Sequence, residues 1–242
     1  MTRPILTLTG LAVALTTVLG TAFLAGCGAR SDSSLFPLEP GRSWTYRVST
    51  ELSDNTSERE TLTLHSQGRD DLDGQPTWQR RSSSGVSYWL RSDATGIFRV
   101  ASKTDLEAEP TLDKQPRYVL KAPYVAGTQW QSSTTAYLLQ RRNEFPREIR
   151  HTHPSIPMQY QIEAVNEAVD TPAGQFKQCL RVKGSATVRL YADPTSGWKD
   201  LPLTTLEWYC PGVGLARLER SEPAGSGFLV GGTLRMELSA WQ

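Results

Sequence analysis

The fold is decided by stretches such as Thr233-Leu234-Arg235-Met236-Glu237-Leu238-Ser239, in which apolar and polar residues alternate without a break. The run Trp44-Thr45-Tyr46-Arg47-Val48-Ser49 follows the same rule. Successive side chains of a β-strand point to opposite faces, so a period of two predicts strands that bury one face and expose the other. Antiparallel sheets allow this one-sided burial, whereas parallel sheets are usually covered on both faces.

Similar segments recur along the chain. They predict strands near 60–66, 76–81, 86–91, 96–101, 117–121, 128–139, 159–168, 175–183, 186–192, 203–210 and 214–221. Turn-forming residues separate them, at Asp73-Gly74, Ala94-Thr95-Gly96, Thr171-Pro172-Ala173-Gly174, Lys183-Gly184 and Pro211-Gly212. Segments 103–116 and 140–150 lack the alternation, and we expect short helical or irregular excursions there. The pattern favours an all-β protein built on a curved antiparallel sheet, a half-barrel or open barrel, although a β-sandwich fits almost as well.

The N-terminus has the layout of a secretory signal. Arg3 is followed by an uncharged, largely apolar stretch that ends in small residues. Leu24-Ala25-Gly26-Cys27 resembles the lipobox cut by lipoprotein signal peptidase, so we expect cleavage between Gly26 and Cys27 and lipidation of Cys27. A transmembrane helix and an ordinary signal cut at an A-x-A site are the weaker alternatives, because glycines and threonines interrupt the stretch and no basic cluster follows it.

This interpretation sets the expected domains and compartment. Residues 1–26 are the signal peptide, 27–35 the lipidated N-terminus and flexible tether, and 36–242 a single β-rich periplasmic domain. Each buried methylene of an acyl chain contributes about 0.8 kcal/mol, and stable anchoring needs more than one chain. The expected partner is therefore the lipid bilayer, reached through the N-terminal acyl chains. In enterobacteria-like systems an aspartate directly after the lipidated cysteine is the usual signal for retention in the inner membrane. Gly28 stands at that position here, which favours the outer membrane, with the protein facing the periplasm.

The charge balance argues against nucleic-acid binding, and the cysteine content indicates a disulfide. Without the leader, basic and acidic residues are equal at 25 each, so we expect no binding to nucleic acid. If Cys27 carries lipid, Cys179 and Cys210 remain. In an oxidising compartment two such thiols most simply form a disulfide, which would add roughly 3–4 kcal/mol if unstrained. Two separate buried thiols are the alternative.

A spacing of Pro-x3-Gly-x2-Trp occurs twice, ending at Trp44 and at Trp130. In each copy the glycine permits a backbone turn closed to other residues, and the tryptophan is expected to fill the start of a sheet. The two copies could mark two related halves of the domain or could be a coincidence.

Three segments together resemble a family. They are Phe36-Pro37-Leu38 with Gly41 and Trp44-Thr45-Tyr46, then 171–180, and then Trp208-Tyr209-Cys210-Pro211-Gly212-Val213-Gly214-Leu215. The set resembles a group of poorly characterised bacterial envelope lipoproteins with an FPL-x2-G-x2-W-x-Y start and a WYAPGVGLV-like hairpin. The resemblance implies a curved antiparallel sheet, similar to the half-barrels of LolA- and LolB-type lipoprotein carriers, and no established activity. Cys210 stands where the family pattern usually has alanine, which offers Cys179 a possible disulfide partner. We interpret the motif residues as structural, namely Trp44, Tyr46, Trp130, Trp208, Gly212 and Gly214.

Catalytic and metal-binding patterns are absent from the sequence. His151 and His153 would face one side of an extended segment, but no carboxylate or cysteine has ligand spacing beside them. Ser226 lacks the G-x-S-x-G pattern of a nucleophile elbow. We therefore expect no enzymatic activity, no metal and no cofactor.

Seven tryptophans and eight tyrosines in a membrane-tethered β-protein favour an apolar ligand or lipid held on the curved sheet. The alternative function is a scaffolding module that binds another envelope protein.

Lipidation can be tested directly. Mass spectrometry of the protein made in its native host should show a chain that begins at Cys27 and carries a diacylglyceryl thioether and an amine-linked acyl group. An unmodified thiol or an intact leader would contradict the anchor.

Overall fold

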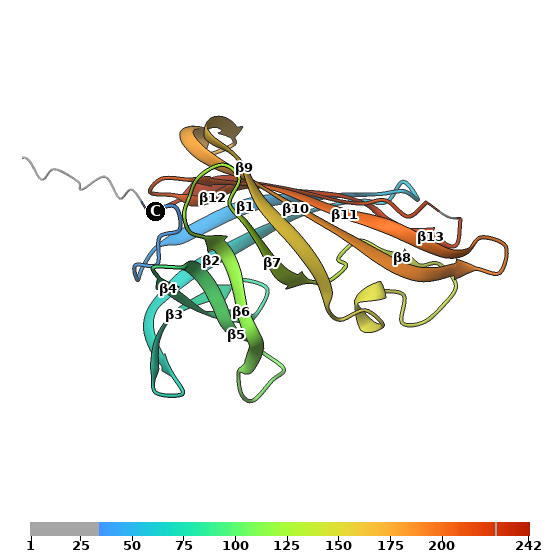
Figure 1. Ribbon diagram of the computed structural model, residues 1–242, viewed down its shortest axis with the longest axis horizontal. Helices are drawn as coiled ribbons and strands as arrows, with labels where there is room; N and C mark the ends of the chain where they lie inside the picture. The colour runs from blue at the N-terminus through green and yellow to red at the C-terminus, as the bar shows by residue number, and fades with distance from the viewer. Residues whose placement is uncertain (1–33, 226) are drawn as a thin grey trace, which may run out of the picture. The chain divides into compact units, whose positions relative to one another are not determined.

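The structure is a computed structural model that describes residues 34–225 and 227–242 (Figure 1). Gly26 and Cys27 lie outside the described residues. Strands dominate the described part, which holds one short 3-10 turn, η1 (Ile149–His151). The strands are β1 (Ser43–Leu52), β2 (Ser57–Leu72), β3 (Gln75–Ser82), β4 (Val86–Asp93), β5 (Gly96–Thr104), β6 (Thr111–Lys121), β7 (Gln129–Thr134), β8 (Gln140–Arg141), β9 (Ile156–Thr171), β10 (Gly174–Asp193), β11 (Gly197–Cys210), β12 (Gly214–Glu222), β13 (Leu229–Val230) and β14 (Gly232–Trp241). Within the described ranges, no helix is of a length and hydropathy suited to crossing a membrane.

Twelve strands form one antiparallel sheet in the order β6-β5-β4-β3-β2-β1-β14-β12-β11-β10-β9-β7. The two outermost strands, β6 and β7, approach each other, and the Ser132 hydroxyl donates to the Tyr118 carbonyl at 3.3 Å. No strand pairing joins β6 to β7 in the part of the chain that the structure describes. The sheet is therefore a nearly closed barrel with one unsealed seam. This confirms the predicted open barrel, and the sandwich alternative is wrong because all twelve strands belong to one sheet.

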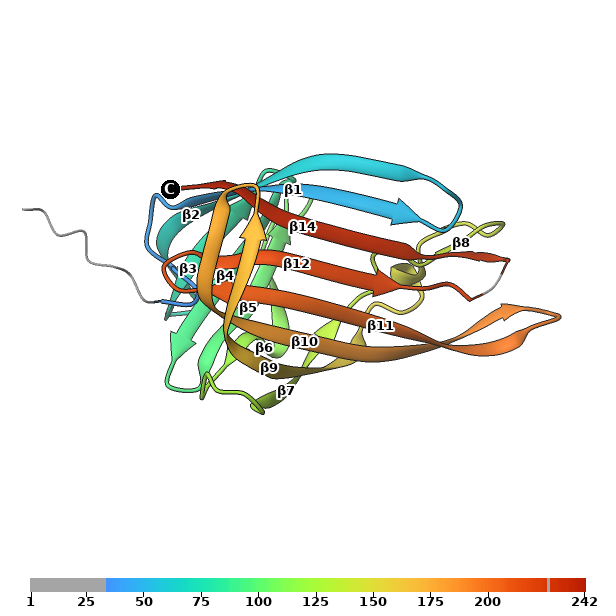
Figure 2. The same cartoon turned by 90° about the horizontal axis from the view of Figure 1, so that it is seen from above.

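The sheet curls because its strands twist and several pairs contain register shifts of the β-bulge type. Figures 1 and 2 show β3, β4, β5 and β6 turning under the long strands, while the β10–β11 hairpin extends beyond them. Inward-facing residues alternate with outward-facing ones along the long strands. Leu201, Leu203 and Tyr209 of β11 are buried inside, for example. The inner face of this curved sheet is the core.

Residues 135–155 cover the inner face of the projecting part of the sheet. Leu139 and Ile149 are almost fully buried there against Met158, Leu190 and Leu203. The segment contains only β8 and η1, so the prediction of an irregular excursion at 140–150 is confirmed. This segment replaces the second layer that a sandwich would supply.

A buried carboxylate holds the covering segment in place. Glu222, the last residue of β12, is fully buried. Its oxygens accept the backbone N–H groups of Tyr137, Leu138 and Leu139 at 2.8–3.1 Å. They also accept Nε of Arg220 at 2.5 Å, and another nitrogen of that guanidinium donates to the Thr135 carbonyl at 2.6 Å. Buried backbone donors that cannot reach water are thereby satisfied.

The structure corrects three local expectations. β10 runs straight through Lys183-Gly184, where a turn was predicted. A Cβ at Gly184 would lie 2.8 Å from the Tyr160 ring and 2.5 Å from the Thr205 hydroxyl oxygen. Glycine is therefore needed here because these two side chains pack against the backbone, and not because the chain turns. The strand predicted over 128–139 ends at Thr134, where the chain leaves the sheet as the covering segment. The excursion predicted over 103–116 is shorter, because β6 begins at Thr111.

The predicted disulfide between Cys179 and Cys210 is confirmed, with the two sulfur atoms 2.06 Å apart. Cys179 precedes Leu180 of β10, which pairs with Tyr209 of β11. The bond therefore joins neighbouring strands at the barrel end of the long hairpin, which excludes the alternative of two separate thiols.

Replacing Glu222 should destabilise the fold more than replacing its neighbour. Glu222→Gln leaves the Arg220 cation without its carboxylate partner, and breaking such a buried pair costs about 3–5 kcal/mol. Glu219→Gln is the matched control, because Glu219 lies on the outer face of the same strand with a partly exposed ion pair to Arg235, worth under about 1 kcal/mol. Urea unfolding measures both. Equal losses in the two variants would contradict the role assigned to Glu222.

Candidate functional site: the barrel interior

Two motifs about 170 positions apart in the sequence form one contact. The indole N–H of Trp44 donates to the Val213 carbonyl at 2.6 Å, and the Tyr46 hydroxyl donates to the Leu215 carbonyl at 2.9 Å. Gly212 and Gly214 have φ of 74° and 90°, which residues with a Cβ rarely adopt. The β1 motif and the β11–β12 hairpin therefore lock together at one end of the barrel.

An arginine completes this lock. The Arg80 guanidinium lies 4.2 Å from the ring centroids of both Phe36 and Trp44. It donates to the Pro37 carbonyl at 2.6 Å. Desolvation by burial lowers the pKa of Arg80 to about 10, which leaves the guanidinium charged at neutral pH. This end of the interior thus holds a buried cation between two aromatic rings, a favourable cation–π arrangement.

The other motif tryptophans lie on opposite faces of the sheet. Trp130 points inward and stacks on Tyr160, with ring centroids 5.5 Å apart. Its turn glycine, Gly127, has a positive φ of 92° like the corresponding Gly41 at 81°. Trp208 lies on the outer face, half-buried, and its indole N–H donates to Glu167 at 2.9 Å. Trp208 therefore stabilises the outer surface and does not line the interior.

A cavity of about 340 Å³ lies inside the barrel. Its wall contains six of the eight tyrosines in the sequence, three arginines, one carboxylate and several apolar side chains. The tyrosines are Tyr46, Tyr88, Tyr118, Tyr137, Tyr160 and Tyr209, the arginines are Arg80, Arg99 and Arg117, and the carboxylate is Glu207. They come from strands on both sides of the barrel and from the covering segment. The closure of the sheet is therefore what brings them together.

Burial sets the protonation of these groups. Desolvation raises the pKa of Glu207, and the Tyr209 hydroxyl, 2.6 Å from its Oε2, donates a hydrogen bond that partly offsets the shift. Desolvation likewise raises the pKa of Tyr46, Tyr160 and Tyr209. These phenols are therefore uncharged at neutral pH and act as hydrogen-bonding groups on an otherwise apolar wall.

The seam between β6 and β7 opens next to this cavity. A groove of about 510 Å³ runs along it, lined by residues of β6, β7 and the chain before β9. Arg99 and Arg117 line both the groove and the interior cavity. These two arginines thus mark the boundary between the seam and the interior.

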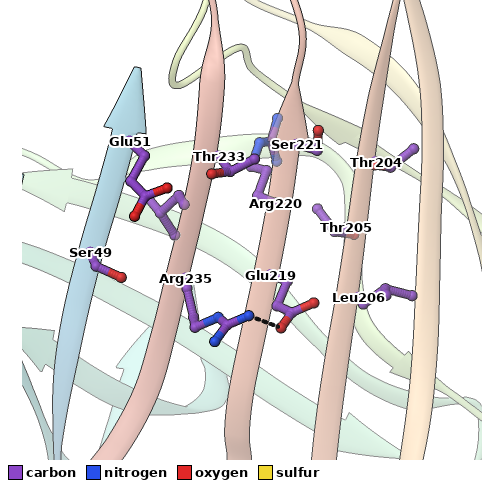
Figure 3. Close-up of a pocket in the computed structure, with 11 residues that line it drawn as sticks. Ser49, Glu51, Thr204, Thr205, Leu206, Glu219, Arg220, Ser221, Thr233 and Arg235 are labelled. Atoms are coloured by element: carbon purple, nitrogen blue, oxygen red, sulfur yellow. Dashed lines mark ion pairs between the residues drawn. The ribbon is translucent and has the colours of Figure 1, made fainter. Parts of the chain in front are cut away.

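The outer face of the sheet carries a separate hollow of about 410 Å³ (Figure 3). Side chains of β1, β14, β12 and β11 surround it, and Arg235 points toward Glu219, with a nitrogen-to-oxygen distance of 3.1 Å. Glu219 also pairs with Arg217. Because these charges compensate one another in solvent, the hollow offers less for recognition than the interior does.

No cluster of three or more metal-ligating side chains is found in the described ranges. His151 lies in η1, where its Nε2 is 3.5 Å from a Glu148 oxygen. The two histidines considered as metal ligands therefore lie in a surface turn.

Sequence reasoning missed the polar lining of the cavity. Glu207 stands in Leu206-Glu207-Trp208, where alternation assigns the apolar neighbours to the interior, yet Glu207 is buried and Leu206 and Trp208 face outward. The nearest available signal was Tyr209, two positions on and therefore on the same face as Glu207.

The known proteins that resemble this chain are few and distant. No protein-family model matches the chain, and no curated protein does either. One similar solved structure is a predicted lipoprotein from Parabacteroides distasonis, with 14% identity and a TM-score of 0.42, covering 87% of this chain and 99% of that one. Another is a predicted exported protein with a YmcC-like fold from Bacteroides fragilis, with 14% identity and a TM-score of 0.37, covering 86% and 98%. Similarity at this level adds nothing to the functional assignment.

The raised pKa of Glu207 predicts a pH-dependent stability. The folded state holds this proton more tightly than the unfolded chain, whose pKa is near the ordinary 4.5. Below pH 4.5 the group is protonated in both states and does not reduce the free energy of unfolding. As the pH rises from there through the folded-state pKa, the free energy of unfolding falls, because the unfolded chain loses this proton first. Glu207→Gln keeps an acceptor for Tyr209 and removes this penalty, so its Tm should exceed that of the wild type increasingly as the pH rises above 4.5. A Tm difference that is constant from acid to neutral pH would contradict the prediction.

Proposed function

We propose that this protein is a noncatalytic envelope lipoprotein, anchored at the periplasmic face of the outer membrane through Cys27, that binds an apolar or amphipathic ligand inside its barrel. The observation that carries the proposal is the interior cavity of about 340 Å³. This volume lies within the range of about 300–1,000 Å³ typical of small-molecule sites.

The chemistry of the wall supports a ligand with an extended apolar part. Leu64, Leu90 and Leu218 provide aliphatic surface, and the tyrosines combine aromatic faces with hydroxyl groups. The lining residues include no serine, cysteine, histidine or lysine. Because burial keeps the phenols protonated, the wall supplies hydrogen bonds and apolar contact rather than a nucleophile.

The predicted anchor would place this cavity near a source of lipid. The carbonyl of Ser34 accepts the Gly212 N–H at 2.8 Å, so the chain already contacts the barrel at this residue. Ser34 lies seven positions after Cys27 in the sequence, and a fully extended chain of that length spans roughly 25 Å. A lipidated Cys27 would therefore hold the barrel close to the bilayer.

A second candidate function is docking of another envelope protein, and one observation favours it. At the tip of the β10–β11 hairpin, Tyr191 and Trp198 form an edge-to-face pair with ring centroids 5.9 Å apart. Both are exposed, and Phe228 is also exposed. Aromatic residues are enriched at protein interfaces. Crosslinking in intact membranes should capture one reproducible partner through Trp198 if this function holds, and uniformly monomeric protein would count against it.

Filling the cavity should weaken ligand binding. Leu218→Trp adds an indole on the inner face of β12, whereas Leu206→Trp adds one on the outer face of β11 and is the matched control. The neutral fluorescent probe N-phenyl-1-naphthylamine should bind the wild type and the control, and at least about tenfold more weakly to Leu218→Trp.

Mass spectrometry of lipid extracts provides the complementary measurement. Protein that is produced without its lipid anchor should release a bound ligand, and Leu218→Trp should release much less. Circular dichroism and Tm show whether each variant is folded. Absence of any ligand, together with equal probe binding by both variants, would refute the proposal.

A further inference from the structure

We infer that the interior site is selective for acidic amphiphiles, with the carboxylate or phosphate head bound at Arg117 and the chain lying among the interior tyrosines. This inference rests on the proposed function and names the ligand class of the same site. It follows from three features: an arginine without an ion pair or hydrogen bond among the described residues, the composition of the wall and the position of the seam.

The first feature is a difference between two arginines on neighbouring strands, of which one forms an ion pair and the other does not. Arg99 of β5 and Arg117 of β6 are in register across the two strands. Arg99 forms a bidentate ion pair with Asp113, at 2.5 and 2.7 Å. The Arg117 side chain has neither an ion pair nor a hydrogen bond to any residue that the structure describes. Its five N–H donors are therefore available to a ligand.

The second feature is an excess of positive charge around the cavity. Three guanidinium groups line it against one carboxylate, that of Glu207. Asp113 neutralises Arg99, whereas Arg80 contacts aromatic rings and a carbonyl instead of an acid. Charge that is partly removed from water is costly without a partner and interacts strongly with an opposite charge. An anionic ligand would supply that partner, and a cationic ligand would be repelled.

The third feature is where Arg117 lies. It is half-buried and lines both the interior cavity and the groove along the unsealed seam. Lys114 and the hydroxyls of Ser132 and Ser133 line the same groove. A head group at Arg117 would thus remain partly hydrated at the seam while an attached chain passes into the interior. The guanidinium fork matches both carboxylate and phosphate in a bidentate geometry.

The test compares ligands that share a chain and differ in the head. Dodecanoic acid, dodecyl phosphate and dodecanol are titrated by isothermal calorimetry against the unlipidated domain at pH 8 and low salt, below the micelle concentrations of the two acids and the solubility limit of the alcohol. The wild type should bind the two acids roughly tenfold or more tighter than the alcohol, since hydrogen bonds to charged groups are the stronger ones. A preference for one acid over the other tells which head group the site fits.

Arg117→Gln should remove the preference while keeping the affinity for the alcohol. Arg235→Gln, which removes an outer-face arginine, should change neither. Arg117→Lys keeps the charge without the fork and should retain part of the preference, so it serves as the second variant if Arg117→Gln does not fold. Raising the salt should weaken binding of the acids by the wild type and leave the alcohol unaffected.

The outcomes separate the two claims. Equal binding of acids and alcohol by the wild type would overturn the inference and leave the interior site intact, as would a preference that survives in Arg117→Gln. Binding of none of the three ligands would instead refute the proposed function.

Discussion

The architecture depends on one buried carboxylate. A sheet that curls without closing leaves part of its inner face uncovered, and here residues 135–155 cover it. An irregular segment brings backbone donors into the core with no strand to pair them. Glu222 accepts three of these donors and the Arg220 guanidinium at once. An isolated carboxylate would be costly at full burial, but one surrounded by donors is satisfied and fixes the position of the segment. Tyr137, which this interaction positions, lines the interior cavity.

The opposite end of the interior is closed by different physical means. There the β1 motif and the β11–β12 hairpin are joined by hydrogen bonds from Trp44 and Tyr46, and by the Arg80 cation between two rings. The disulfide ties β10 to β11 beside this contact. The barrel is thus cross-linked by contacts at both ends of the cavity, while no strand pairing joins β6 to β7 among the residues that the structure describes. A preformed cavity with one unpaired seam is a structure that can admit a ligand without unfolding.

Polarity inside the barrel is what gives the cavity chemical character. An aliphatic interior would pack to native density and leave nothing to recognise. Tyrosine hydroxyls, the Glu207 carboxyl and three arginines instead require hydrogen-bonding partners within a partly buried region. Neighbouring groups meet part of that requirement, as in the contact between Tyr209 and Glu207. The Arg117 side chain has no ion pair or hydrogen bond to any residue that the structure describes, and it lies where the seam meets the interior.

The sequence by itself determined the period-two pattern, and with it the all-β class, most strand positions, the antiparallel arrangement and the pairing of Cys179 with Cys210 as the simplest outcome. The class, the strand positions and the antiparallel arrangement follow from local physics, since side-chain alternation and turn chemistry act over a few residues. The cysteine pairing follows instead from the two thiols that remain in an oxidising compartment once Cys27 is assigned to lipid. Only the tertiary structure decided the rest. Gly184 was predicted to form a turn, but it lies within β10, where the Tyr160 ring packs against it. Trp208 lies on the outer face of β11, because its neighbour Glu207 faces inward. The cavity could not be predicted because its wall is assembled from strands far apart in the chain. Which polar residues face inward depends on barrel closure and strand register, and neither is encoded in any single strand.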